Sequence, residues 1–125
     1  MKPLHWVGSC LKSVRDFPEE VRQEVGFSLQ LAQKGGKAAN AVPLVGFGSS
    51  KVLEVIIDDS GDTFRAIYTV KFKKAIYALH AFQKKSKKGR ETPRPEVDLI
   101  KSRLKLAEAH YRASYLETEK KDSAR

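Results

Sequence analysis

Apolar residues alternate with polar ones in the middle of the chain and recur at helical spacing on both sides of it. Four apolar or alternating runs, each bounded by turn-forming residues, predict strands at 4–7, 52–57, 63–70 and 75–82. In the third run the alternation places Phe64 and Tyr68 on one face of the strand and Arg65 on the other. Residues 37–43 are predicted to form a loop, and the glycine-rich segment after them a turn.

Helical periodicity predicts three helices. A short one follows Ser9, a second runs from Pro18 to the glycine pair at 35–36, and a third begins near Pro95. The third carries one apolar seam, with side chains spaced 3, 4, 3 and 4 residues apart: Val97, Ile100, Leu104, Ala107 and Tyr111. The order β-α-α-β-β-β-α predicts an α+β domain, a small antiparallel sheet packed by helices. We expect it to span residues 1–117, with a polar, frayed tail at 118–125.

The composition is that of a globular domain without a membrane span. Hydrophobic residues make up 41% of the 125 residues, and no run approaches the roughly 18 to 20 apolar residues of a spanning helix. The single cysteine, Cys10, is predicted to be a small structural residue near a helix start. We therefore expect a cytoplasmic protein. His5 and His110 have no partners at metal-ligand spacing, so we expect no metal and no other cofactor.

The formal charge of the chain is concentrated in one third of it. Residues 71–105 hold twelve Lys or Arg and three Asp or Glu, and 12 − 3 equals the net charge of +9 of the whole chain. Charge segregated in this way predicts a polyanionic partner such as RNA. Besides Lys84 and Lys85, the predicted RNA-binding residues are Lys71, Lys73, Lys74, Lys87, Lys88 and Arg90.

Two further residues are candidates for chemistry at such a surface. A guanidinium held on a strand, that of Arg65, is able to stabilise a phosphorane-like transition state; the alternative is a surface salt bridge, for example to Glu54. His80 lies in an apolar run, where a histidine is usually packed and hydrogen-bonded. If its ring reached the surface, it would serve as a general acid or base.

The strings FPEEVRQEVGFSLQLAQKG, PLVGFG, TFRAIYTVKF and AIYALHAFQKKSKKGRETP resemble the RelE/ParE toxin superfamily, and most closely its phage-derived, HigB-like branch. The resemblance runs from about Phe17 to about His110. It implies a small sheet wrapped on one side by helices, and ribosome-dependent cleavage of messenger RNA. It also implies neutralisation by a small antitoxin, which in this branch usually carries a helix-turn-helix DNA-binding domain.

The resemblance implies roles for single residues as well. Arg65 matches the arginine that supports the transition-state phosphate, and Lys84 and Lys85 match basic residues that contact RNA and take part in activity. Lys87 and Lys88 extend that patch. Several members carry a catalytic tyrosine near the C-terminus, for which this chain offers only Tyr111 or Tyr115. The general acid or base therefore stays open, with His80 and Tyr111 as candidates.

The leading hypothesis is metal-independent cleavage, in which the ribose 2′-hydroxyl attacks its own phosphate. Two alternatives remain: a ParE-like toxin that blocks DNA gyrase and cuts nothing, or a phage protein that only coats nucleic acid. On the leading hypothesis Arg65→Ala abolishes growth inhibition and leaves the fold intact.

Overall fold

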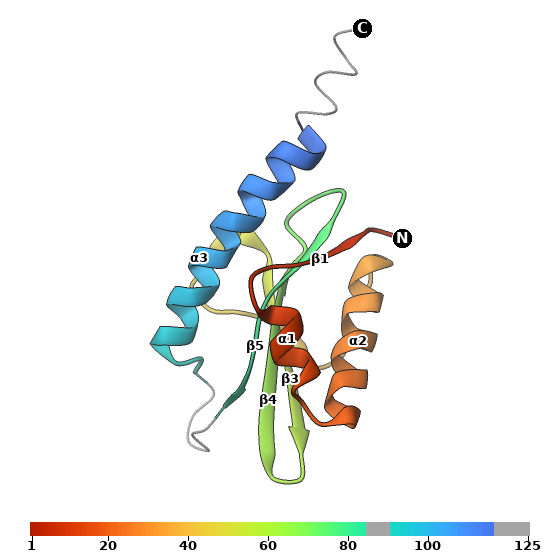
Figure 1. Cartoon of the computed structure of the whole chain (residues 1–125), viewed down its shortest axis with the longest axis vertical. Helices are drawn as coiled ribbons and strands as arrows, with labels where there is room; N and C mark the ends of the chain where they lie inside the picture. The colour runs from red at the N-terminus through yellow and green to blue at the C-terminus, as the bar shows by residue number, and fades with distance from the viewer. Residues whose placement is uncertain (85–90, 117–125) are drawn as a thin grey trace, which may run out of the picture.

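A five-stranded sheet lies between two layers of helices in the computed structural model, which describes residues 1–84 and 91–116 (Figure 1). The elements are β1 (Leu4–Trp6), α1 (Cys10–Arg15), α2 (Glu19–Gln33), β2 (Ala41–Pro43), β3 (Val52–Asp59), β4 (Asp62–Thr69), β5 (Ile76–Lys84) and α3 (Arg94–Tyr111). A short 3-10 helix at Gly48–Ser50 leads into β3, and a π-helical turn at Arg112–Leu116 follows α3. The predicted tail at 118–125 lies outside the described residues.

The strand order is β1-β5-β4-β3-β2, and the pairs from β2 to β5 are antiparallel. The β3–β4 hairpin turns at Ser60 and Gly61, both with positive φ, the conformation that a tight two-residue hairpin turn requires. The α+β class is confirmed, with two differences. β1 pairs with β5 in parallel, and β2 forms where a loop was predicted. β2 is three residues long and contains Pro43, so it has no periodic signal of its own.

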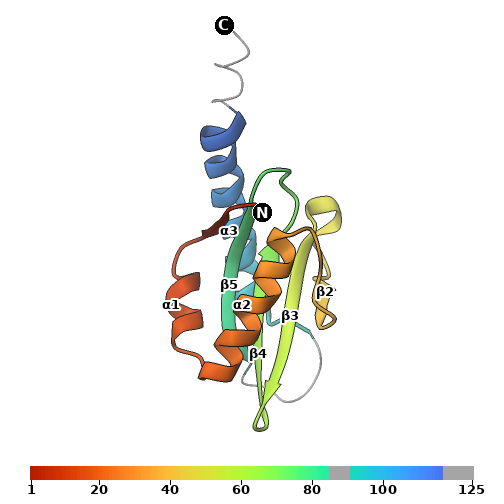
Figure 2. The same cartoon turned by 90° about the vertical axis from the view of Figure 1, so that its right-hand side faces the viewer.

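Helices cover both faces of the sheet, so the expectation of helices on one side is wrong. The first face is covered by α1 and α2, whose buried residues include Val14, Val21 and Leu29, and the sheet contributes Tyr68 among others. The second face is covered by α3, which packs its predicted seam against residues such as Ile67. In Figure 2, α2 lies in front of the sheet and α3 behind it. The seam prediction is confirmed, because its members are buried or half-buried.

A β-bulge in β5 decides which side chains face α3. Ile67 of β4 pairs with His80, but the next residue, Tyr68, pairs with Ala78, so Leu79 has no partner of its own in β4. Without the extra residue, His80 would point to the same face as Ala78, toward α2. With it, both Leu79 and His80 face α3. Bulges of this kind re-aim side chains, and here the re-aimed side chain is a titratable one.

Cys10 is the first residue of α1 and is 1% exposed, which confirms the structural role predicted for it. Burial raises the pKa of its thiol to about 12, so the reactive thiolate is strongly disfavoured. In the described part of the chain, no helix combines the length and the apolar character needed to cross a bilayer.

Candidate functional site

Charged and titratable side chains occupy the space between the sheet and the first half of α3, where an apolar core would be expected. Five of them are 9% exposed or less: Glu54, Arg65, His80, Lys84 and Arg103. Burying charges without strong pairing destabilises a protein, and replacing such groups by apolar residues is often neutral or stabilising. A cluster of this kind is therefore a candidate functional site rather than a requirement of the fold.

The strand register brings these residues together. Glu54 of β3 pairs with Ile67 of β4, and Ile67 pairs with His80 of β5, so Glu54 and His80 lie in one row on the α3 face, two strands or about 10 Å apart. Arg65 lies two residues along β4 from this row, on the same face. Lys84 lies two residues further in that direction, paired with Thr63. The cluster thus crosses three strands at the end where α3 begins.

Arg65, Glu54 and Thr92 form the first half of the cluster. Arg65 Nη1 donates to Glu54 Oε1 over 3.0 Å, and the two side chains are only 4% and 5% exposed. Arg65 Nη1 also donates to Thr92 Oγ1 over 3.4 Å, while that hydroxyl donates to Glu54 Oε2 over 2.6 Å. Thr92 lies just ahead of α3, so these bonds tie the start of the helix to β3 and β4.

The structure changes the interpretation of Arg65. Its partner is Glu54, as one alternative held, but the pair is buried rather than on the surface. A guanidinium in this position is not presented to a phosphate in solvent. It nevertheless lies beside Thr92, just ahead of α3 and at the end of the sheet where β5 ends at Lys84. Arg65 therefore forms the inner wall of the candidate site.

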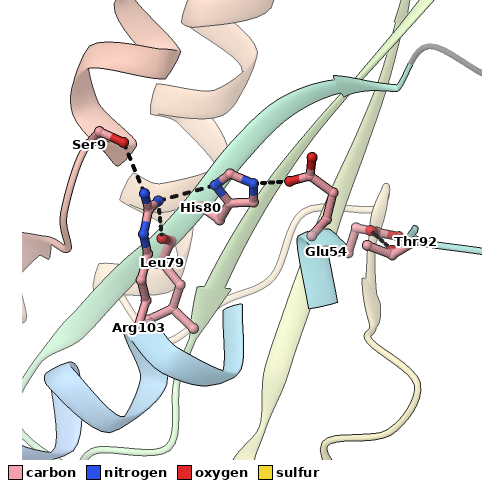
Figure 3. A network of polar contacts seen from close by, with 7 residues as sticks. Ser9, Glu54, Leu79, His80, Thr92 and Arg103 are labelled. Atoms are coloured by element: carbon pink, nitrogen blue, oxygen red, sulfur yellow. Dashed lines mark hydrogen bonds and ion pairs between the residues drawn. The ribbon is translucent and has the colours of Figure 1, made fainter. Parts of the chain in front are cut away.

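His80, Arg103 and Ser9 form the second half (Figure 3). Arg103 donates from Nη1 to the Leu79 carbonyl over 3.0 Å and to His80 Nδ1 over 3.1 Å, and from Nη2 to Ser9 Oγ over 2.9 Å. His80 Nε2 contacts Glu96 Oε2. A guanidinium only donates hydrogen bonds, so Nδ1 of His80 must accept, and the ring proton lies on Nε2 and is donated to Glu96.

Both neighbours and burial influence the protonation of His80. Desolvation is the largest cause and lowers the pKa of the imidazole from its usual 6.5; Arg103 lowers it as well, while the hydrogen bond to Glu96 and the charge of Glu96 oppose the shift. The neutral ring agrees with the tautomer that Arg103 imposes. The prediction of a packed, hydrogen-bonded histidine is confirmed, and neither ring nitrogen is left for a direct role in proton transfer.

The predicted basic residues fall into three groups. Lys84 ends β5 within the cluster and is 8% exposed. Lys85, Lys87, Lys88 and Arg90 lie outside the described residues. Lys71, Lys73 and Lys74 lie in the β4–β5 connection, at the opposite end of β5, about 27 Å away given the rise of a strand. Lys71 also pairs with Glu108 over 3.0 Å. Lys71, Lys73 and Lys74 are therefore not part of the same patch as Lys84.

Tyr111 is also placed away from the cluster. It is 7% exposed, stacks on Phe72, and accepts a hydrogen bond from the Lys74 backbone over 3.1 Å. Along α3 it lies fifteen residues beyond Glu96, about 22 Å at the rise of an α-helix. As the acid or base of a site near Arg65, Tyr111 is excluded by this distance.

Sequence reasoning missed Glu96, Arg103 and Thr92 as members of the site. A signal was present for two of them, since Glu96 and Arg103 each stand next to an apolar seam residue and lie on the inward face of α3, at 4- and 3-residue steps from Ile100. A charged residue at an inward position predicts a buried polar partner. That the partner is His80 depends on the bulge, which has no comparable signal in the sequence.

The cluster combines cations, two carboxylates and a neutral imidazole at one end of the sheet. Arg65, Lys84 and Arg103 carry three positive charges against two negative ones from Glu54 and Glu96, a sum of +1. In the described segments, no three His, Cys, Asp or Glu side chains are grouped in a way that would hold a metal ion. The arrangement suits the binding of an anion and the transfer of a proton.

Comparison with known proteins identifies the family. The family model described as phage-derived protein Gp49-like (DUF891) matches residues 12–105, well over half of the chain. No curated protein and no solved structure matches the chain. The matched range includes both halves of the charged cluster except Ser9. The chain belongs to the Gp49-like family of phage-derived proteins.

Proposed function

We propose that this protein is the toxin of a toxin–antitoxin pair and that it cleaves messenger RNA on the ribosome. The Gp49-like family is associated with RelE-like toxins, and the resemblance in sequence runs in the same direction. The observation that carries the proposal is the buried charged cluster, which lies at the start of α3 and includes Lys84, the residue after which the lysine-rich segment follows in the chain. Stability alone does not account for so many charges inside one side of a small domain.

In the proposed reaction the 2′-oxygen of a ribose attacks the adjacent phosphate, and the 5′-oxygen of the next nucleotide leaves. Lys84 and Lys85 would contact the phosphate, and Lys87, Lys88 and Arg90 would hold the flanking backbone, since lysine and arginine bind phosphates strongly. Arg65 would act as a positioning residue, because its buried guanidinium donates hydrogen bonds to Glu54 and Thr92 and so holds both side chains in place. This role replaces a direct contact between Arg65 and the phosphate.

The proposed partners are the ribosome and messenger RNA as substrate, and a small helix-turn-helix antitoxin as inhibitor. A ribosome orients its message, so a protein with few catalytic groups would suffice for cleavage once the substrate is held in line. The net charge of +9 favours association with the ribosome and the message, because RNA is a polyanion.

Brief expression in bacteria followed by primer extension on cellular messages tests the proposal. We expect growth to stop and discrete cuts to appear in register with codons within minutes of induction. Intact messages with damaged chromosomes would instead assign the protein to the gyrase-inhibiting class. Intact messages and chromosomes, with RNA binding that falls steeply with salt, would leave only a coating function.

A further inference from the structure

We propose that the carboxylate of Glu96 is the catalytic base that takes the proton from the attacking 2′-hydroxyl. This inference rests on the proposed function and deepens it, since the acid or base of the site was left open. The geometry that carries it is a chain of hydrogen bonds from Ser9 through Arg103 and His80, which ends at Glu96.

Glu96 is much more exposed than Arg103 and His80, the two charged or titratable residues before it in this chain. Arg103 is 9% exposed, the His80 side chain is 9% exposed, and the Glu96 side chain is 30% exposed. Glu54, the other carboxylate of the cluster, is only 5% exposed and is paired with Arg65. Of the two carboxylates, Glu96 is therefore the one that a substrate in solvent can reach.

Arg103 donates at both of its ends, to Ser9 Oγ and to His80, and from Arg103 to Glu96 the bonds run in one direction. Arg103 donates to His80 Nδ1, which fixes the ring proton on Nε2, and Nε2–H donates to Glu96 Oε2. A carboxylate that accepts a hydrogen bond of this kind is held in one orientation. Two oxygens give a carboxylate about four acceptor sites, so the bond from His80 leaves capacity for a substrate hydroxyl.

The position of Glu96 in the fold also favours it as the base, and the other two candidates, His80 and Tyr111, are excluded. Glu96 is in the first turn of α3 and follows Thr92 by four residues, so it lies at the same end of the sheet as Arg65. His80 has both nitrogens engaged, and Tyr111 is about 22 Å away along the helix. Glu96 is thus the proton acceptor best placed in the described part of the cluster.

The proposed step balances as follows. The 2′-O–H bond breaks and its proton moves to Glu96; the 2′-oxygen forms a bond to phosphorus, and the bond from phosphorus to the 5′-oxygen breaks. The leaving 5′-oxygen takes a proton from solvent water or from a neighbouring ammonium. The products are a 2′,3′-cyclic phosphate and a 5′-hydroxyl, and water later restores the ionised form of Glu96.

The test compares cleavage of a ribosome-bound message by the wild type, Glu96→Gln and Glu96→Asp. Gln keeps the shape and still accepts from His80, but it has no basicity. We expect its kcat to fall about 10²-fold or more with little change in KM, the range of general-base catalysis. Asp keeps a carboxylate and should restore part of the rate. The acidic limb of the pH–rate profile should be present in the wild type and absent in Glu96→Gln.

Glu108→Gln is the matched control, because Glu108 is on the same helix, has a similar side-chain exposure of 35%, and pairs with Lys71 at the far end. Its kcat should equal that of the wild type. If the wild type cleaves the message and Glu96→Gln cleaves it at the same rate, Glu96 is not the base, while the proposed function still holds. An equal loss in Glu96→Asp and Glu96→Gln with an unchanged pH profile also overturns it, since a structural role alone would give that result. Absence of cleavage by the wild type overturns both proposals.

Discussion

Replacing Arg65 by alanine is expected to lower the free energy of unfolding by about 3–5 kcal/mol, the cost of breaking a buried ion pair from one side. The carboxylate of Glu54, which is 5% exposed in the wild type, would be left without its cation, and Thr92 would lose one of its two partners in the cluster. Urea unfolding monitored through Trp6 measures this change directly. For a domain of this size the loss removes a large part of the total stability.

Arg22→Ala is the matched control, since Arg22 is exposed on α2 and its removal should change stability by less than about 0.5 kcal/mol. If Arg65→Ala is as stable as the wild type, the buried ion pair contributes nothing to the free energy of unfolding. The expectation that Arg65→Ala leaves the fold intact does not fit this burial. Loss of growth inhibition in that variant alone would therefore not separate catalysis from unfolding.

Neutralising the lysine-rich segment is expected to change RNA binding more than any other surface substitution. The variant is Lys85→Gln, Lys87→Gln, Lys88→Gln and Arg90→Gln together. For single-stranded RNA each phosphate contact contributes about 0.7 to the slope of log affinity against log salt. Because the variant removes four such contacts, we expect the magnitude of the slope to fall by about 2.8. Fluorescence titrations with a short single-stranded RNA between low and moderate salt measure the slope.

The control for this variant uses the lysines at the other end of β5. Lys71→Gln, Lys73→Gln and Lys74→Gln should leave the slope nearly unchanged, because the structure separates them from Lys84 by the length of the strand. Equal reductions in both variants would mean that RNA contacts the whole length of the sheet. A large reduction only in the Lys71 group would move the binding surface away from the charged cluster.

Much of the fold was predictable because its signals are local. The strands at 52–57, 63–70 and 75–82, the hairpin turn and the apolar seam of α3 all follow from periodicity and turn residues. The placement of Arg65 opposite Phe64 followed from the same alternation and is confirmed. β2 was missed because its pairing with β3, not its own sequence, makes it a strand.

The site was predictable only in part, because its contacts join residues far apart in the chain. Arg103 contacts Ser9 across 94 positions, and Glu96 contacts His80 only because the bulge at Leu79 turns the ring toward α3. The alternation of apolar and polar residues predicted the face of the sheet on which Arg65 lies, but it did not predict that α3 covers this face and buries the side chain. The basic run in the sequence likewise did not show that β5 separates Lys71, Lys73 and Lys74 from Lys84.

If the buried charges serve function rather than stability, the double variant Glu54→Leu/Arg65→Met should keep its fold and lose its activity. Both charges are removed together, so neither is left buried without a partner, and stability should stay equal or rise by about 1–4 kcal/mol. Growth after induction and thermal unfolding are measured on the same variant. We expect a protein that folds at least as well as the wild type but no longer stops growth. A folded variant that inhibits growth as strongly as the wild type would contradict the claim.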